Sequence, residues 1–226
     1  RLMTICSIAL VMLVAVGATL AYFFSEDVAS NEFKTGDSPT HGVEVTITEP
    51  GWTDDNGKDL YPGDVATKDP RIINKKGEAY ARIVVMLYDT NGASPVLITD
   101  KAKSDKIMNL TFFTDTKPGK MTSAELAALK RINDAQFTEV TGHSFGAGVR
   151  IFDYKGADGT NKMAPGVEAQ LFSGVAIPTD WEQKDVDELG NFNIDVMGQA
   201  VQAKNLTADE AKVELDKLLT KRLEGK

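Results

Sequence analysis

One stretch of the sequence decides the fold class: AYARIVVMLY, residues Ala79–Tyr88. It is apolar at odd and even positions alike, and Arg82 is the only charged residue in it. A strand with this pattern buries both of its faces, because successive side chains point to opposite sides of a sheet. The stretch therefore predicts a central strand that is covered on each side.

Shorter strand patterns lie before and after this stretch, and turn residues separate them. Val43, Val45 and Ile47 alternate with polar residues, which is the pattern of a half-buried strand. A similar alternation begins at Phe192 and continues to about Ala203. Further short strands are expected at 71–74, 96–98, 110–113, 149–154, 167–172 and 175–177. Strands at this spacing favour an antiparallel β-sandwich over alternating strands and helices.

Two helices are expected among the strands. Thr122–Glu125 and Thr207–Glu210 both have the capping-box pattern, in which a threonine hydroxyl and a glutamate carboxylate bind free amides of the first turn. The first helix carries apolar residues at near-helical spacing: Leu126, Leu129 and Ile132. The second, a C-terminal helix over 207–223, has one apolar stripe: Ala211, Leu215, Leu218, Leu219 and Leu223. We expect the stripe to pack on the domain, and a docking face for a partner is the alternative.

The N-terminus has the pattern of a secretory signal peptide over residues 1–21. Arg1 precedes an apolar stretch without charged residues, and small residues occupy the end of that stretch. We expect cleavage between Ala21 and Tyr22. A membrane anchor is the alternative, since about 20 apolar residues can span a bilayer. Cleavage would remove Cys6, the one cysteine of the chain, so the exported protein would form no disulfide.

Composition and motifs disfavour several classes of function. The 33 acidic and 25 basic residues give a net charge of −8, and a nucleic-acid binder needs positive charge to meet phosphate. The sequence has no zinc-protease, serine-hydrolase or phosphate-loop motif. His143 stands beside a serine in a glycine-rich turn, and His41 lies in a polar stretch. Neither histidine is expected to be catalytic, because a catalytic pair needs a third residue that orients it.

Two acidic loops, 54–59 and 153–158, could gather oxygen ligands around calcium. Neither loop has the full EF-hand spacing with its closing glutamate. We expect plain turns and no cofactor, and calcium binding is the alternative.

The residues around the end of the apolar stretch resemble the signal-peptide junction of the TasA/camelysin (CalY) family. They read Gly17-Ala18-Thr19-Leu20-Ala21-Tyr22-Phe23, then Asp27, Asn31-Glu32-Phe33 and Thr35-Gly36. Three further parts of the chain agree with the family in order: Tyr61–Asp64 with Lys68-Asp69, Asn74–Ala81, and the closing strands Phe172–Trp181 and Val196–Ala203. The chain departs from the family by one extra residue in Phe23–Glu26 and by a small insertion at His41. These departures leave the register of the first strand open.

The resemblance implies a jelly-roll-like domain with helical insertions over residues 41–226, secreted and assembled into extracellular fibres of the biofilm matrix. It implies export through the signal peptidase SipW and self-association into a homopolymer, and an accessory matrix protein is a further partner that this function allows. Residues 22–40 would then be a free segment that adds a strand to the next subunit. Its apolar residues are the candidates for strand donation: Tyr22, Phe23, Phe24, Val28 and Phe33. The alternative is that the segment forms an ordinary first strand of its own domain.

Two other functions compete with a fibre subunit. Camelysin members of the family are described as cell-surface, casein-cleaving metalloproteases, but zinc hydrolysis needs about three fixed ligands and the chain has 2 histidines. A secreted module that binds a matrix polysaccharide would use Trp52 and Trp181 as its platforms. We expect a protein that is not an enzyme and that acts in the extracellular matrix or at the cell surface.

Overall fold

The strands of the described chain form three antiparallel sheets. The computed structural model describes residues 24–28, 42–53, 57–58, 60–116, 118–156 and 158–225. About 34% of the residues are in strands and 21% in helices, so the fold is mainly β as predicted. The expected signal peptide, Ala21, Tyr22, Phe23, Phe33, His41 and most of the acidic loop at 54–59 lie outside the described residues.

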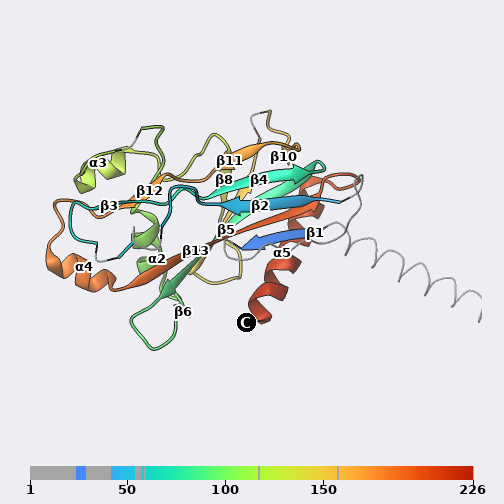
Figure 1. The fold of residues 1–226 in the computed structure, drawn as a ribbon. Helices are drawn as coiled ribbons and strands as arrows, with labels where there is room; N and C mark the ends of the chain where they lie inside the picture. The colour runs from blue at the N-terminus through green and yellow to red at the C-terminus, as the bar shows by residue number, and fades with distance from the viewer. Residues whose placement is uncertain are drawn as a thin grey trace, which may run out of the picture.

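The largest sheet has seven strands, with β5 (Ala79–Asp89) at its centre (Figure 1). The order across it is β1 (Phe24–Val28), β13 (Phe192–Gln202), β5, β9 (Val149–Tyr154) and β8 (Phe137–Val140). Two short strands, β6 (Val96–Leu97) and β10 (Lys162–Met163), pair with the two ends of β5. β13 pairs with β5 over its whole length, and β9 pairs with the other edge of β5. The prediction of a central strand over Ala79–Tyr88 is therefore confirmed.

Two three-stranded sheets form a second layer against one face of the large sheet. One has the order β11 (Glu168–Gln170), β4 (Arg71–Lys76) and β2 (Glu44–Thr48), and the other β3 (Val65–Thr67), β12 (Gly174–Ala176) and β7 (Thr111–Phe112). The main hydrophobic core lies between the layers and joins Ile83 and Val85 of β5 to Ile47 and Ile72 of the smaller sheet. The strands predicted at 43–47, 71–74, 149–154 and 192–203 are present with small changes at their ends.

The other face of the large sheet is covered by the C-terminal helix α5 (Ala208–Glu224), which lies on the side away from β2 and β4 (Figure 1). Val84 and Met86 of β5 pack there with Leu219. Burial on both faces explains why β5 is continuously apolar. Ala211, Leu215 and Leu219 are buried, which confirms that the stripe packs on the domain.

Both predicted capping boxes form, at Thr122–Glu125 and Thr207–Glu210. The first helix, α3 (Ser123–Ala128), is shorter than its apolar spacing suggests, because Leu129 has an extended backbone. The following segment instead forms an isolated bridge between Lys130 and Phe113, the residue after β7. Five elements were not predicted from the sequence: α2 (Lys101–Met108), α4 (Gln183–Leu189), β3, β8 and β10.

Candidate functional site

The described part of the candidate donor segment is a strand at the edge of the chain's own sheet. β1 runs antiparallel to β13, and its register places Phe24 opposite Val201 and Val28 opposite Met197. β13 is its one pairing partner among the described strands, so five residue pairs hold it in the sheet. The alternative of a first strand within its own domain is therefore the arrangement that the structure has for Phe24–Val28.

The strand that receives β1 is lined differently on its two faces. Val201 and Met197, opposite the ends of β1, are buried in the clusters that include Leu215 and Leu219 of α5. Gly198 faces the second layer, where a Cβ at this position would come within 2.8 Å of Ile47. Glycine thus allows β2 to lie directly on β13 beside the edge that β1 occupies.

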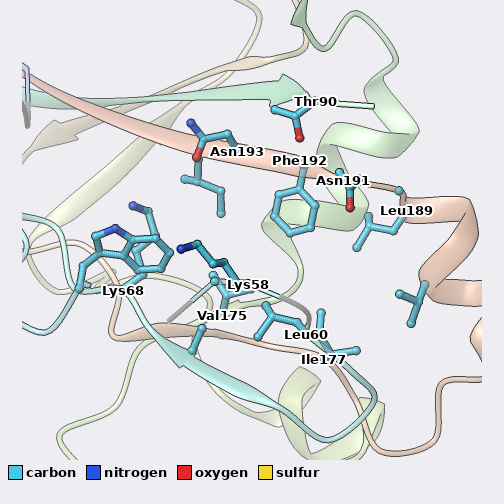
Figure 2. Close-up of a pocket in the computed structure, with 16 residues that line it drawn as sticks. Lys58, Leu60, Lys68, Thr90, Val175, Ile177, Leu189, Asn191, Phe192 and Asn193 are labelled. Atoms are coloured by element: carbon cyan, nitrogen blue, oxygen red, sulfur yellow. The ribbon is translucent and has the colours of Figure 1, made fainter. Parts of the chain in front are cut away.

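Among the described residues, no strand lies along that same edge at the first half of β13. Phe192–Val196 pairs with β5 on one side, and no strand in the described ranges pairs with its other side. A cavity of about 510 Å³ lies at this end of β13, between the two layers. Its apolar lining comes from separate elements: Leu60, Val175, Ile177, Leu189 and Phe192. Figure 2 shows the Phe192 ring pointing into the cavity, with Thr90, Asn191 and Asn193 along its rim.

The two tryptophans line different cavities. Trp52 borders the cavity at the start of β13, and the buried Lys68 Nζ lies 4.5 Å from its ring centroid. The same ammonium pairs with Glu49 at 2.8 Å. Trp181 borders a separate cavity of about 480 Å³, with Lys106 Nζ 4.9 Å from its ring centroid. The structure does not bring the two proposed platforms together at one site.

His143 has the surroundings of a packed loop residue. Its ring lies 5.8 Å from that of Phe145, and burial lowers its pKa. Its Nδ1 atom is buried and has no hydrogen-bond partner in the described part of the chain. In the part of the chain that the structure describes, no carboxylate orients the ring through this atom, as one does in a catalytic triad.

The acidic loop that begins at Asp153 does not converge on one point. Asp153 faces Lys212 at 3.7 Å, and burial raises its pKa. Asp158 instead accepts hydrogen bonds from the Thr160 backbone at 3.1 Å and hydroxyl at 2.8 Å. Over the described ranges, no three histidine, cysteine, aspartate or glutamate residues gather where they could hold a metal ion. A search of the same ranges finds no helix with the length and apolarity needed to cross a membrane.

A buried arginine links the large sheet to α5. In the sequence it was noted only as the one charged residue of the apolar stretch Ala79–Tyr88. Arg82 is 1% exposed, and its Nε donates to Gln199 Oε1 at 2.8 Å. Its two terminal nitrogens donate to Asp216 Oδ1 at 2.6 Å and to the Leu215 carbonyl. A single charge inside an apolar strand was the signal that could have indicated this structural role.

The edge that β1 covers and the cavity both lie along β13, and together they make this strand the candidate functional site. Sequence reasoning named Phe24 and Val28 on the covering strand but missed the cavity, because its lining residues are far apart in the chain. Comparison with models of known protein families and with curated proteins finds no match for this chain.

Proposed function

We propose that the chain is a secreted structural subunit of extracellular biofilm-matrix fibres, which assembles head to tail by donating its N-terminal strand. One observation supports the proposal: the edge of β13 at Met197–Val201 accepts a five-residue strand, here the chain's own Phe24–Val28, and a second copy could supply the same strand. This strand lies at the edge of the sheet and comes before the rest of the domain in the sequence. Another copy can therefore supply the same strand in its place. The resemblance of the N-terminal junction to the TasA/camelysin family supports this function.

Exchange of this strand between copies needs no new interface chemistry. A neighbour's segment can form the same main-chain ladder on Met197–Val201 that the chain forms with itself. Each copy gives one strand and accepts one, and such a head-to-tail contact grows a filament when it does not close into a ring. In this function the antiparallel layers belong to a jelly-roll-like domain, and SipW releases the segment by cleavage between Ala21 and Tyr22.

The partners follow from this mechanism. The main partner is a second copy of the chain, an accessory matrix protein is a further one, and nucleic acid is disfavoured by the net charge of −8. No metal or other cofactor takes part in the strand exchange.

Electron microscopy of the purified chain that begins at Tyr22 tests the function. We expect unbranched fibres, and secreted material whose N-terminal sequence begins at Tyr22. A chain that remains monomeric at high concentration would contradict the proposal. Chelator-sensitive cleavage of casein would instead favour the metalloprotease, and retention of a monomer by polysaccharide would favour the binding module.

A further inference from the structure

We propose that the cavity beside Trp181 binds an acidic sugar, with the sugar ring against the indole and its carboxylate between Lys106 and Arg131. The cavity of about 480 Å³ lies within the ~300–1,000 Å³ of sites that hold small ligands. All of its lining residues belong to described parts of the chain. The inference does not depend on strand donation, because α3 beside the cavity and β1 lie toward opposite ends of the molecule (Figure 1).

Trp181 is held in place as an aromatic wall of the cavity. Its backbone amide closes a turn onto the Pro178 carbonyl at 3.2 Å. The neighbouring Asp180 accepts hydrogen bonds from the Ser123 amide at 2.8 Å and from its hydroxyl at 2.9 Å, which fastens the turn to the start of α3. Trp181 is partly exposed and packs against the main core. An indole ring offers a large apolar face, on which the C–H groups of a sugar ring can pack.

The rest of the lining combines apolar and polar groups. Leu110, Leu126 and Pro178 are buried, and Leu129 is partly buried. Asn109 is exposed and contributes an amide that can both donate to and accept from a hydroxyl group. A mostly apolar wall with a few polar groups is the usual composition of a site for a small ligand. A sugar ring has both kinds of surface.

The charge of the lining points to an anion. Among the described residues that line the cavity are the cations Lys106 and Arg131 and no carboxylate, although the chain has 33 acidic and 25 basic residues. The cavity between α5 and β9 is different, because Glu139, Asp153 and Asp209 contribute to its lining. Complementary charge favours a negatively charged ligand at the Trp181 cavity.

Both cations have capacity for a second partner. Lys106 Nζ donates to the Asp185 carbonyl at 3.2 Å, and it lies 3.5 Å from Glu188 Oε2. A strong pair of this kind has a separation of about 2.7–2.9 Å. Glu188 is 72% exposed at its side chain, so it can turn to water when a ligand carboxylate arrives. Arg131 Nη2 donates to Glu139, and a guanidinium has five N–H donors.

Fluorescence of Trp181 tests the site in the chain that begins at Tyr22, which keeps every residue that the structure describes. Trp52→Phe leaves Trp181 as the one tryptophan of the chain, so its emission reports on this ring. The probe is tetragalacturonate, and the matched control ligand is its full methyl ester, which keeps the sugar rings and loses the charge. We expect a saturable change with tetragalacturonate, a Kd at least about tenfold lower than for the ester, and weaker binding as salt is added.

Substitutions test the part played by the cations. Lys106→Gln should raise the Kd of tetragalacturonate by about tenfold, whereas Lys106→Arg should keep it within about threefold, because the charge remains. Lys130→Gln is the matched control, since Lys130 is 61% exposed at its side chain, pairs with Asp134 and does not line the cavity. It should change the Kd by less than about twofold.

Three results would overturn the acidic-sugar site. The first is no saturable change in Trp181 emission at millimolar concentrations of tetragalacturonate, and the second is equal binding of tetragalacturonate and its ester. The third is an equal loss in Lys106→Gln and Lys130→Gln, which would indicate attraction to the general surface charge. The comparison of the two ligands needs no substitution inside the cavity, so it stands even where a variant fails to fold. Fibre formation is measured separately, so the failure of one proposal is distinguishable from the failure of the other.

Discussion

At the scale of single residues, Arg82 shows how one buried charge can join two layers. Its guanidinium is enclosed between β5 and α5 and donates to Gln199, Asp216 and the Leu215 carbonyl. Asp216 is 49% exposed at its side chain, so this carboxylate can regain water if the arginine is removed, whereas the buried Gln199 cannot. The main loss on removing Arg82 would therefore come from unpaired buried oxygens rather than from the ion pair.

Replacing Arg82 by methionine should lower the free energy of unfolding by about 2–4 kcal/mol, because buried acceptors lose their donor while most of the side-chain volume is kept. Urea titration followed by circular dichroism measures the change. Lys217→Met is the matched control, since Lys217 pairs with Glu214 at 2.7 Å but is 66% exposed at its side chain. It should cost less than about 0.5 kcal/mol. Equal effects of the two substitutions would contradict a structural role for Arg82.

Asp153 and Asp158 should give the protein opposite pH dependences. Burial raises the pKa of Asp153, and the attraction of Arg82 and Lys212 opposes this shift. The folded state then holds the proton more tightly than the unfolded chain, so stability falls as pH rises from about 3.8 through the folded pKa. For Asp158, hydrogen bonds from the Thr160 backbone and hydroxyl lower the pKa, so its contribution is present above the unfolded value of 3.8 and is lost as pH falls.

Melting temperatures of Asp153→Asn and Asp158→Asn between pH 3 and pH 7 test these signs. Relative to the unsubstituted protein, Asp153→Asn should gain stability as pH rises, because asparagine removes a carboxylate that is costly to ionise. Asp158→Asn should lose relative stability over the same range. A pH-independent difference for Asp153→Asn would mean that its carboxyl titrates alike in the folded and unfolded states.

At the scale of elements, sequence signals worked where they were local and repeated. The threonine–glutamate capping boxes located the starts of α3 and α5, and period-two alternation located β2 and β13. α2 was not predicted because half of its residues are charged, although its N-cap Asp100 accepts a hydrogen bond from the Ala102 amide at 2.8 Å. α4 was not predicted because its capping box uses a glutamate and an aspartate in place of the usual threonine and glutamate. Two-residue and three-residue strands have too few positions to show a period.

The packing of α5 gives a prediction at this scale. Leu219 is fully buried against Val84, Met86 and Met197 of the large sheet, whereas Val213 on the same helix is 54% exposed. Leu219→Ala should lower the free energy of unfolding by about 2–4 kcal/mol through lost burial and the cavity it leaves. Val213→Ala should change it by less than about 0.5 kcal/mol. Chemical denaturation of both variants measures these changes in the free energy of unfolding. A small effect at Leu219 would show that α5 contributes little to the stability of the fold.

At the scale of the whole molecule, the sequence predicted the layers better than the site. The continuous apolar run at Ala79–Tyr88 identified the central strand, because burial on both faces is visible in the residues themselves. The cavity could not be foreseen, since it joins Leu60, Val175 and Leu189 through the stacking of separate sheets. The strand order was equally hidden: β1 and β13 are neighbours although almost the whole domain separates them in sequence. Long-range pairing of this kind leaves no periodic trace.

The last prediction concerns the edge that this long-range pairing covers. Deleting residues 22–33 from the exported chain should leave a folded domain that cannot form fibres and melts at a lower temperature. Its β13 would expose the backbone groups of Met197–Val201, which are paired with β1 in the intact chain. Adding the deleted segment as a free peptide should raise the melting temperature again. At a peptide concentration one hundred times its Kd, binding should increase the free energy of unfolding by about 2.7 kcal/mol.

Variants of the peptide distinguish specific binding to the edge of β13 from non-specific binding. Phe24→Asp or Val28→Asp should abolish the rise in melting temperature, because both residues stand opposite buried positions of β13, at Val201 and Met197. Ser30→Lys should have a much smaller effect, since continuing the register would set it opposite the partly exposed Asp195, where a positive charge meets no like charge. Normal fibres from the truncated chain would exclude strand donation, and assembly would then have to use another surface, such as α5. A peptide effect without fibres in the intact chain would instead indicate that β1 serves only to complete its own domain.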